Sequence, residues 1–489
     1  MAPSIEGYRV GMQTLERIRI TRLDGGLVEL TKDALAGLAS GIDGRILREG
    51  DDGWDEAVLT WNGMVAAAPA LVAQPETPEE VSAAIRFARD HELRLSVKGG
   101  GHHIAGISIA ERGLTLDMSR MREVEVDPDR RIARVGPGCR LQDVDRATQE
   151  HGLATVLGFV SVVGVAGLTL GGGLGYLTRR FGWAVDNLLE VEIVTADGRI
   201  RRASRDENSD LFWAIRGAGA NFGAVTRFTF RLHPVGPMVY GGLIAWPFER
   251  ADEILKAYRA ITTEAPRDLS VWLVLLRAPA APFVPDVAHG KRILAMAVCY
   301  SGDLARTEEV LAPLRALGNP VFDGLHEQPY VRVQSYLDET EPKGMHYYWK
   351  TGYLSELPDE LLTTARDLFA ECPMPEGELG FLHLAGALNE RDPDDGAVGN
   401  RDARYVTGVK GMWRPGEPQA REFERWVREA WEKLRLFSTG GNYVNFQSAD
   451  EDESRIRATY GQNFDRLREL KAKYDPANFF RSNRNIPPR

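Results

Sequence analysis

The sequence predicts a two-domain α+β protein, and three observations carry this prediction. The chain has 489 residues, enough for two to four domains. In the first half, helix and strand signals alternate around glycine-rich turns. After Pro234 and Pro237 the rhythm changes to strands separated by longer amphipathic helices. Hydrophobic residues make up 43% and charged residues 27%, as in ordinary folded chains.

The regular pattern of the first half begins near residue 69. Thr77 can cap a helix, Pro78 suits the first helical position, and Glu80 completes a capping box. The apolar residues that follow recur with helical spacing, so a helix is expected over this segment. It leads into the strand LRLSV, which ends directly at three consecutive glycines.

The rest of the first half continues this alternation. CRLQDVDRATQEHG indicates a helix that Gly152 ends, and LEVEIVTADGRI indicates a strand entering a tight turn at Asp197 and Gly198. NSDLFWAIRG then predicts a short helix, and AVTRFTFRL predicts an alternating strand.

The second half predicts an antiparallel sheet with helices on one side. Its strands are SVWLVLLRA, RILAMAVCY, HYYWKTGYL, ELGFLHLAGAL and RYVTGVKGMW. The acidic stretch from Asn389 to Arg404 is expected to be a solvated loop. From Tyr443 onward the tail is too short for its own core, so we expect it to return to the first domain.

Charge and cysteine content exclude several classes of protein. The formal net charge is −10 with scattered basic residues, which argues against a nucleic-acid partner. We see no leader-like N-terminus and no apolar run long enough to span a bilayer, so no membrane contact and a cytoplasmic location are expected. Cys139, Cys299 and Cys372 lack CxxC spacing and are expected to be buried or half-buried thiols.

Three glycine-rich stretches indicate a dinucleotide site: KGGGHHIAG, VVGVAGLTLGGGLGYL and RGAGANFGAV. Glycine lets backbone N–H groups face a ligand without a Cβ in the way, as pyrophosphate binding requires. None of the three has P-loop or GxGxxG spacing, so several loops would share the phosphates. GFVSVVG lacks the spacing of a nucleophile elbow, and the adjacent His102 and His103 lack that of a zinc site.

These motifs, in this order, resemble the berberine-bridge-enzyme-like branch of the flavoprotein oxidases that share the vanillyl-alcohol-oxidase fold. The resemblance covers roughly residues 60 to 489 and includes KGGGH, VGVAGLTLGGGLGYLTRRFGWAVDN, DLFWAIRGAGANFGAVT, YVNF and YDPANFF with NRNIPP. It implies FAD and a PCMH-type FAD-binding domain. We therefore expect an FAD-binding domain over residues 1–239 with its core at 69–239, a substrate domain over 240–442, and a C-terminal segment, 443–489, that returns to the first domain.

The resemblance also implies how the flavin is held. In this family the histidine after the glycines is bonded covalently to the methyl group of the flavin's benzenoid ring, and here that residue is His102. His103 would be an untethered neighbour. An alkylated imidazole withdraws electron density, which should raise the reduction potential of the flavin.

A second tether, formed in many relatives by a cysteine, would fall on Val160 in this chain. Cys139 lies in a different segment, so no second cysteinyl bond and a more open site are expected. Val163 falls where relatives carry a residue associated with access of oxygen, and its small size favours oxidase behaviour. The resemblance assigns cofactor binding to Lys98, Gly99, Gly100, Gly101, His102, His103, Gly106, Pro137, Val160, Val163, Gly164, Gly167, Gly223, Val225 and Asn445.

The catalytic base departs from the family pattern. Phe446 stands where several relatives use a tyrosine hydroxyl, and Gly408 stands where others place a glutamate. Because side chains alternate along a strand, Val406, Gly408 and Lys410 should face one way. Lys410 is a candidate for substrate binding, or for base catalysis if burial lowers its pKa. Tyr348 and His383 are further catalytic candidates on neighbouring strands.

The expected function is that of an FAD-dependent oxidase that takes hydride from a small organic substrate and reduces oxygen to hydrogen peroxide. Alcohols, carbohydrates and amines all stay open as substrates, as does oxidative cyclisation of a secondary metabolite. Two alternatives remain. One is a flavin dehydrogenase that uses an acceptor other than oxygen, and the other is a catalytically degenerate flavin-binding protein.

Overall fold

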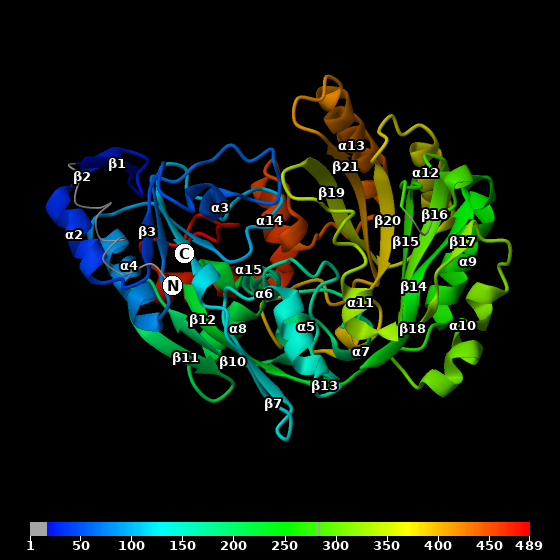
Figure 1. Cartoon of the computed structure of the whole chain (residues 1–489), viewed down its shortest axis with the longest axis horizontal. Coiled ribbons are helices and arrows are strands. Elements are labelled where there is room, and N and C mark those ends of the chain that lie inside the picture. Colours follow the sequence, from blue (N-terminus) through cyan, green and yellow to red (C-terminus); the bar gives the residue numbers. More distant parts are fainter. Residues whose placement is uncertain (1–16, 282–283) are drawn as a thin grey trace, which may run out of the picture.

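The computed structural model describes residues 17–281 and 284–489. The first 16 residues of the expected first domain, where we see no leader-like pattern, therefore lie outside the described residues. The chain forms two halves that lie side by side (Figure 1). The blue and cyan segments and the red C-terminal helices belong to one half, and the green-to-orange sheet forms the other.

The first half is built on two sheets. A four-stranded sheet has the order β3-β4-β6-β5, and both β4 and β5 run parallel to β6. A five-stranded antiparallel sheet has the order β11-β10-β12-β8-β7. Two short pairs, β1-β2 and β9-β13, lie beside them. The strands are β1 (Arg17–Thr21), β2 (Leu27–Thr31), β3 (Arg45–Leu47), β4 (Leu71–Gln74), β5 (Leu95–Lys98), β6 (Leu114–Asp117), β7 (Val124–Asp127), β8 (Ile132–Val135), β9 (Leu153–Ala154), β10 (Leu188–Val194), β11 (Ile200–Ser204), β12 (Ala224–Arg231) and β13 (His233–Pro234).

The helices of this half confirm most of the predicted elements. The Thr77 hydroxyl caps α4 by accepting a hydrogen bond from the Glu80 amide at 3.2 Å. A capping box also requires the Glu80 carboxylate to accept a hydrogen bond from the Thr77 amide, and this part of the prediction is wrong. The carboxylate instead accepts from the amides of Glu76 and Gly44, which lie against the start of the helix. The helices are α2 (Lys32–Ser40), α3 (Trp54–Val58), α4 (Pro78–Asp90), α5 (Leu141–Gln149), α6 (Val165–Leu170), α7 (Thr178–Phe181) and α8 (Ser209–Ala218).

The second half is one antiparallel sheet, as predicted. Its order is β17-β14-β16-β15-β20-β21-β19, with β18 also paired to β14. The strands are β14 (Met238–Pro247), β15 (Leu269–Arg277), β16 (Arg292–Tyr300), β17 (Phe322–Asp323), β18 (His326–Pro329), β19 (His346–Leu354), β20 (Glu378–His383) and β21 (Tyr405–Trp413).

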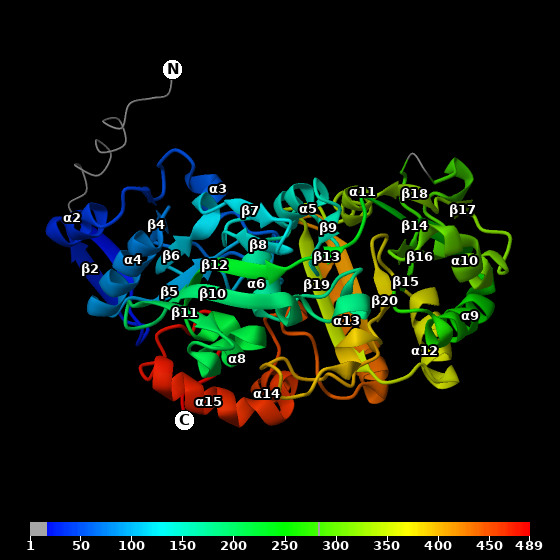
Figure 2. The ribbon, with the colours of Figure 1, turned by 90° about the horizontal axis from the view of Figure 1, so that it is seen from below.

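Helices cover only one face of this sheet (Figures 1 and 2). Residues such as Val271 and Leu273 of β15 pack under them, whereas Trp272 and Val274 point to the opposite face. That opposite face is turned toward the first half. The helices of this half are α9 (Ala251–Glu264), α10 (Thr307–Arg315), α11 (Tyr330–Gln334), α12 (Asp359–Ala370) and α13 (Ala420–Leu434).

The C-terminal segment lies against the first half. Its helices are α14 (Glu453–Tyr460) and α15 (Phe464–Tyr474), and α15 packs on α8 (Figure 2). Tyr443, Phe464 and Ile486 are buried in the same hydrophobic core as the residues of α8 and β12. The tail therefore obtains its core from earlier parts of the chain.

The predicted solvated loop from Asn389 to Arg404 is wrong in its second part. Ala397 and Ala403 are fully buried, and the Arg401 guanidinium forms two hydrogen bonds with the carboxylate of Asp186, at 2.7 and 3.0 Å. The loop crosses from the sheet to the first half and fills the junction, and composition alone does not reveal this.

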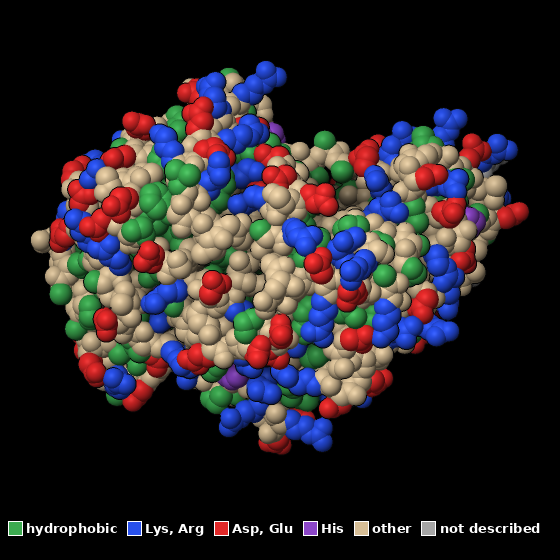
Figure 3. All heavy atoms as spheres, turned by 180° about the vertical axis from the view of Figure 1, so that it is seen from behind, with side chains coloured by type: hydrophobic (Ala, Val, Ile, Leu, Met, Phe, Trp, Pro, Cys, Tyr) green, Lys and Arg blue, Asp and Glu red, His purple; other side chains and the backbone are tan. Residues whose placement is uncertain are grey.

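The surface carries charges of both signs. On the face shown in Figure 3, basic and acidic side chains are interspersed rather than gathered into one track. None of the described helices is long and apolar enough to cross a membrane. All three cysteines are buried and free. Across residues 17–281 and 284–489, no group of three His, Cys, Asp or Glu side chains could hold a metal ion.

Candidate functional site

A cavity of about 1050 Å³ lies between the first half and the helix-free face of the sheet. It gathers most of the residues that the sequence singled out. Those that line it are Gly99, Gly100, Gly101, His102, His103, Pro137, Val160, Val163, Gly164, Gly167, Gly223, Val225, Lys410 and Asn445. Lys98, Gly106, Tyr348 and His383 do not line it.

The cofactor-side wall is made largely of backbone. A Cβ on Gly100 would lie 2.5 Å from the amide nitrogen of Gly164, so the two loops touch through their main chains. Gly101 has a φ of +68°, a conformation that residues with a Cβ rarely adopt. The β5 glycine loop and the loop before α6 therefore form a surface of exposed peptide groups, with no side chains between them and the cavity.

His102 stands at the end of this glycine loop, beside an aromatic stack. Its ring lies 5.9 Å from that of Trp61, nearly parallel to it, and Trp61 in turn stacks on Tyr347 at 3.8 Å. Burial lowers the pKa of His102 to about 4, helped by the positive charges of Lys343 and Arg140. The imidazole is therefore neutral at pH 7, and a ring nitrogen keeps its lone pair.

His103 is held differently from its neighbour. Its Nδ1 accepts a hydrogen bond from the amide of Ala105 at 3.1 Å, which fixes the ring inside the loop. Burial, with Arg484 nearby, lowers the pKa of His103 to about 3. This residue shapes the turn while also lining the cavity.

Lys98 and Gly106 support the loop from outside the cavity. The Lys98 ammonium is buried 3.5 Å from the carboxylate of Asp117 on the neighbouring strand β6. Gly106 has a φ of +66°, and a Cβ there would collide with Val65. Both residues act on the shape of the glycine loop rather than on the cavity itself.

The C-terminal segment closes one side of the cavity with Tyr443, Asn445 and Phe446. The Asn445 amide donates to the carbonyl of Leu168 at 3.0 Å and to the Tyr443 hydroxyl at 2.8 Å. The indole of Trp349 donates to the carbonyl of Phe446 at 2.7 Å, which connects this segment to β19. Asn445 is thus fixed between the first half and the sheet.

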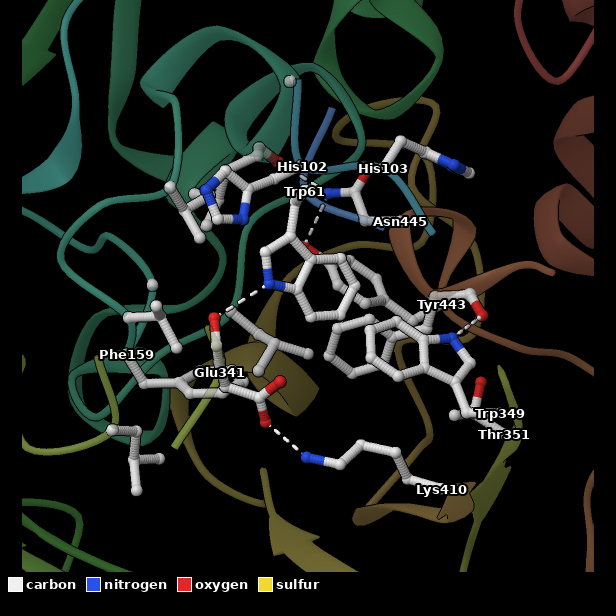
Figure 4. Close-up of a pocket in the computed structure, with 18 of the residues that line it drawn as sticks. Trp61, His102, His103, Phe159, Glu341, Trp349, Thr351, Lys410, Tyr443 and Asn445 are labelled. Carbon is white, nitrogen blue, oxygen red and sulfur yellow. Dashed lines mark hydrogen bonds and ion pairs between the residues drawn. The ribbon is translucent and has the colours of Figure 1, made fainter. Parts of the chain in front are cut away.

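Charged side chains gather on the sheet side of the cavity. Lys410 of β21 forms an ion pair with Glu341, in the loop before β19 (Figure 4). It forms a second ion pair with Glu378 of β20, at 3.0 Å. Burial lowers the pKa of Lys410, but the two carboxylates raise it more, so the ammonium stays charged. The condition under which Lys410 would act as a base, a lowered pKa, is not met.

Glu341 has the opposite balance. Burial raises its pKa, and Lys410 opposes that effect only in part. One carboxylate oxygen pairs with Lys410, whereas Oε2 is buried and has no hydrogen-bond partner in the described chain. Glu341 therefore offers an unpaired, buried oxygen at the cavity.

Tyr348 and His383 lie on the other face of the sheet. The Tyr348 hydroxyl donates to Asp450 at 2.6 Å and accepts from Arg428 of α13. His383 stacks on Tyr405, and burial lowers its pKa to about 2. The alternation of β19 and β20 turns both side chains away from the cavity, so the geometry gives no support to a catalytic role for either.

Sequence reasoning missed Trp61, Glu341 and Glu378. Trp61 lies in the loop between α3 and β4, and its indole donates to the carbonyl of Glu341 at 3.0 Å. Glu341 lies in the loop LDETEPKG, where Asp338 accepts from the amide of Ser161 at 2.6 Å. No periodic signal marks Trp61 or Glu341, which only the contacts between the two halves bring to the cavity. Glu378 begins the predicted strand ELGFLHLAGAL, and the alternation of that strand could have found it.

Two family models match segments of the chain that line this cavity. A family model described as an FAD binding domain matches residues 69–204, and one described as berberine and berberine like matches residues 442–487. The first contains two of the three glycine-rich stretches, KGGGHHIAG and VVGVAGLTLGGGLGYL, and the second contains the segment with Asn445.

Individual relatives match almost the whole chain. An FAD-linked oxidoreductase of Dictyostelium discoideum is 31% identical, covering 91% of this chain and 95% of that protein. (R)-6-hydroxynicotine oxidase of Paenarthrobacter nicotinovorans is 30% identical over 91% and 97% of the two chains. The crystal structure of 6-hydroxy-D-nicotine oxidase from Arthrobacter nicotinovorans has a TM-score of 0.81 at 26% identity, covering 92% of this chain and 98% of that one.

The residues at the cavity fit FAD. Glycines line one wall of the cavity, so main chain without side chains is available there, as a pyrophosphate held by peptide N–H groups needs. The hydroxyl of Ser108, which lines the same cavity, is buried without a partner among the described residues. Gly99 to His102, the loop before α6 and Asn445 are the parts of the chain that would hold the cofactor.

Proposed function

The chain belongs to the berberine-like family of FAD-linked oxidoreductases, and from that premise we propose that it is an oxidase forming hydrogen peroxide. It takes hydride from an alcohol, a carbohydrate or an amine, or closes a ring in a secondary metabolite. The observation that carries this proposal is one cavity with a glycine-loop wall and His102 on one side and Glu341 on the other. When bound, FAD supplies the acceptor for the hydride and returns the electrons to oxygen.

His102 is proposed to hold FAD covalently. A neutral imidazole is required, and the low pKa of His102 supports it. The tether would be a C–N bond from the imidazole to the methyl group of the benzenoid ring, formed with loss of one C–H and one N–H bond. Oxygen would take up the two protons and two electrons as hydrogen peroxide. The three buried cysteines do not line the cavity, which supports a single tether.

Glu341 is proposed to take the proton from the substrate's heteroatom. Phe446 and Gly408 leave both usual positions for a base without a proton acceptor, and the unpaired Oε2 of Glu341 supplies one. Lys410 stays charged and orients the carboxylate through its other oxygen. Glu378 holds Lys410 from the next strand.

Trp61 is proposed as the positioning residue between the two sides. It contacts His102 through its ring and the Glu341 loop through its indole N–H (Figure 4). Its backbone amide also donates to the carbonyl of Gly101 at 2.9 Å. Trp61 thereby fixes the distance from the tethered cofactor to the proton acceptor. Val163, a small residue at the cavity wall, leaves room for oxygen.

The test combines a denaturing gel with an oxygen assay, using His102→Ala and the matched neighbour His103→Ala. We expect flavin fluorescence in the wild-type and His103→Ala protein bands and none in the His102→Ala band. After anaerobic reduction by dithionite, air should restore the oxidised spectrum rapidly with release of hydrogen peroxide.

Each alternative gives a different result. Flavin that leaves the wild-type protein on denaturation contradicts the tether at His102. Slow reoxidation in air, made fast by a quinone, indicates a dehydrogenase. A tethered flavin that no substrate of the three classes reduces indicates a degenerate flavin-binding protein.

A further inference from the structure

The cavity continues beyond the charged cluster into an apolar arm over the sheet. Successive rows of the antiparallel register place small and apolar side chains on the helix-free face of β14, β16 and β15. Arg277 stands at the end of this arm, where β15 ends. The side chains that form its wall are Leu243, Trp272, Val274, Leu276, Ile293, Ala295 and Ala297.

Two glycines join the apolar arm to the charged cluster. Gly380 of β20 is paired with Gly408 of β21, so these two strands place no side chain on the cavity floor here, and the nearest one from β19 is Thr351, beside Gly408. A Cβ on Gly380 would meet nothing closer than 3.4 Å. Two pairs further along the same two strands, and therefore on the same face, are Glu378 and Lys410. A ligand can therefore cross the floor from the arm to the cluster.

The cluster end has the chemistry of a cation site. Two carboxylates, Glu341 and Glu378, surround the one ammonium of Lys410, which leaves a net negative charge when all three are ionised. Oε2 of Glu341 lacks a partner in the described chain. The indole rings of Trp61 and Trp349, 5.5 Å apart, line the cavity beside it (Figure 4). Aromatic faces next to a carboxylate attract an ammonium group.

We propose that the substrate is an apolar amine, whose nitrogen lies between Glu341 and the two indoles and whose hydrocarbon body crosses the Gly380–Gly408 floor into the arm. This proposal rests on the proposed oxidase function and narrows its substrate class. A sugar in the arm would lose its water without gaining hydrogen bonds, because the arm wall offers none from its side chains.

The reaction balances with the groups present. Glu341 takes one N–H proton from the ammonium form of the substrate, which leaves a neutral amine. The adjacent carbon then loses hydride to FAD, and the C–N single bond becomes the C=N bond of an iminium ion, which water hydrolyses. The hydride and the proton from Glu341 together supply both hydrogens of the hydrogen peroxide that oxygen forms.

The test uses the holoenzyme and three matched probe series. These are N-methyl-ω-phenylalkylamines of increasing chain length, alcohols with the same skeletons, and cellobiose. Anaerobic titration followed by the flavin absorbance measures binding, and bleaching of the same band measures hydride transfer. We expect the amines to perturb and bleach the flavin, with affinity rising with chain length, and the alcohols and cellobiose to bind weakly or not at all.

Two variants separate the two ends of the substrate. Glu341→Gln should slow bleaching by the amines by at least about 100-fold, because the proton acceptor is gone, whereas Glu360→Gln on the exposed side of α12 should not. Gly380→Val should weaken binding of the longest amines by about tenfold and spare the shortest. Gly37→Val in α2, where a Cβ meets nothing within 4 Å, is the matched glycine control.

The outcomes distinguish this proposal from the oxidase function. If alcohols or cellobiose bleach the flavin and the amines do not, the amine proposal is overturned while the oxidase function stands. If no amine perturbs the flavin spectrum of tethered, oxygen-reactive holoenzyme, the amine proposal is likewise overturned. Flavin that is reoxidised slowly in air contradicts the oxidase function instead.

Discussion

The two walls of the cavity use glycine in opposite ways. On the cofactor side, a Cβ on Gly100 would lie within 2.7 Å of two backbone atoms of Gly164, so glycine is needed to let two main chains touch. On the sheet side, Gly380 has room for a side chain, with no atom closer than 3.4 Å to its Cβ position. The first glycine maintains a contact, and the second leaves a space.

This difference separates a wall whose shape is fixed by main-chain contacts from a wall whose shape is set by side chains. The cofactor wall consists of backbone, so its shape depends on a few glycines that admit no replacement. The sheet wall consists of alternate side chains on several strands together with one loop, and each of these can change without disturbing the main chain.

Replacement of Gly100 by alanine should have the largest effect, because it should abolish flavin binding. The new Cβ would collide with the Gly164 main chain, which cannot move without displacing both loops. We expect the purified variant to lack flavin, as measured by the ratio of absorbance at 450 nm to that at 280 nm, which should fall from the wild-type value to near zero.

Gly380→Ala is the matched control for this substitution. It adds the same methyl group at a position with room for it, so flavin content and melting temperature should stay those of the wild type. Full flavin content in Gly100→Ala would show that the cofactor wall tolerates side chains, and the contrast between the two walls would be lost.

The sequence could predict the features that depend on local patterns, but not those that depend on contacts between distant segments. Glycine runs, helix caps and alternating strands are local, so the cofactor loop, α4 and the five quoted strands of the sheet could be predicted from the chain. The two halves were also visible as a change in rhythm after Pro237. Lys410 could be placed on the cavity face because the resemblance puts Gly408 there and the alternation of β21 gives Lys410 the same side.

Of the two partners of Lys410, Glu378 lies on a predicted strand, whereas Glu341 could not be predicted. Glu341 lies in an irregular loop, and it reaches the cavity only because Trp61 and Ser161 of the first half hold that loop. Tyr348 and His383 stand on the correct strands but on the wrong face. A shift of one residue in a strand reverses the side-chain direction, and the sequence does not fix which face meets the cofactor.

Two buried carboxylates at the junction between the halves differ in the partners that they have. Asp186 is fully compensated by Arg401 of the 389–404 loop, through two hydrogen bonds. Asp145 of α5 faces only the neutral amide of Gln334, 3.2 Å away on α11, and its second oxygen has no partner in the described structure. One contact joins the halves through charge, and the other joins them through a neutral hydrogen bond.

Removal of the Arg401 cation, which pairs with Asp186, should therefore lower the free energy of unfolding strongly. Arg401→Met leaves Asp186 buried and unpaired, which we expect to lower the free energy of unfolding by about 3–5 kcal/mol. The double variant Asp186→Asn/Arg401→Met removes both charges and should recover much of that loss. Urea unfolding at pH 7 measures both, and equal losses in the single and double variants would contradict the role of the pair.

Removal of the charge at the second contact should instead stabilise the protein, and only above acidic pH. Burial raises the pKa of Asp145 to about 7, so the folded state holds a proton that the unfolded carboxyl releases near its ordinary pKa. Stability of the wild type then falls as pH rises from about 4 to about 7 and is constant above that range. Asp145→Asn escapes this loss and keeps the bond to Gln334 through its amide oxygen. Its advantage in unfolding free energy should grow across that window to at most about 4 kcal/mol at pH 8. Urea titrations of both proteins at pH 5 and pH 8 measure the difference, and an advantage that does not change with pH would show that Asp145 is already ionised in the fold.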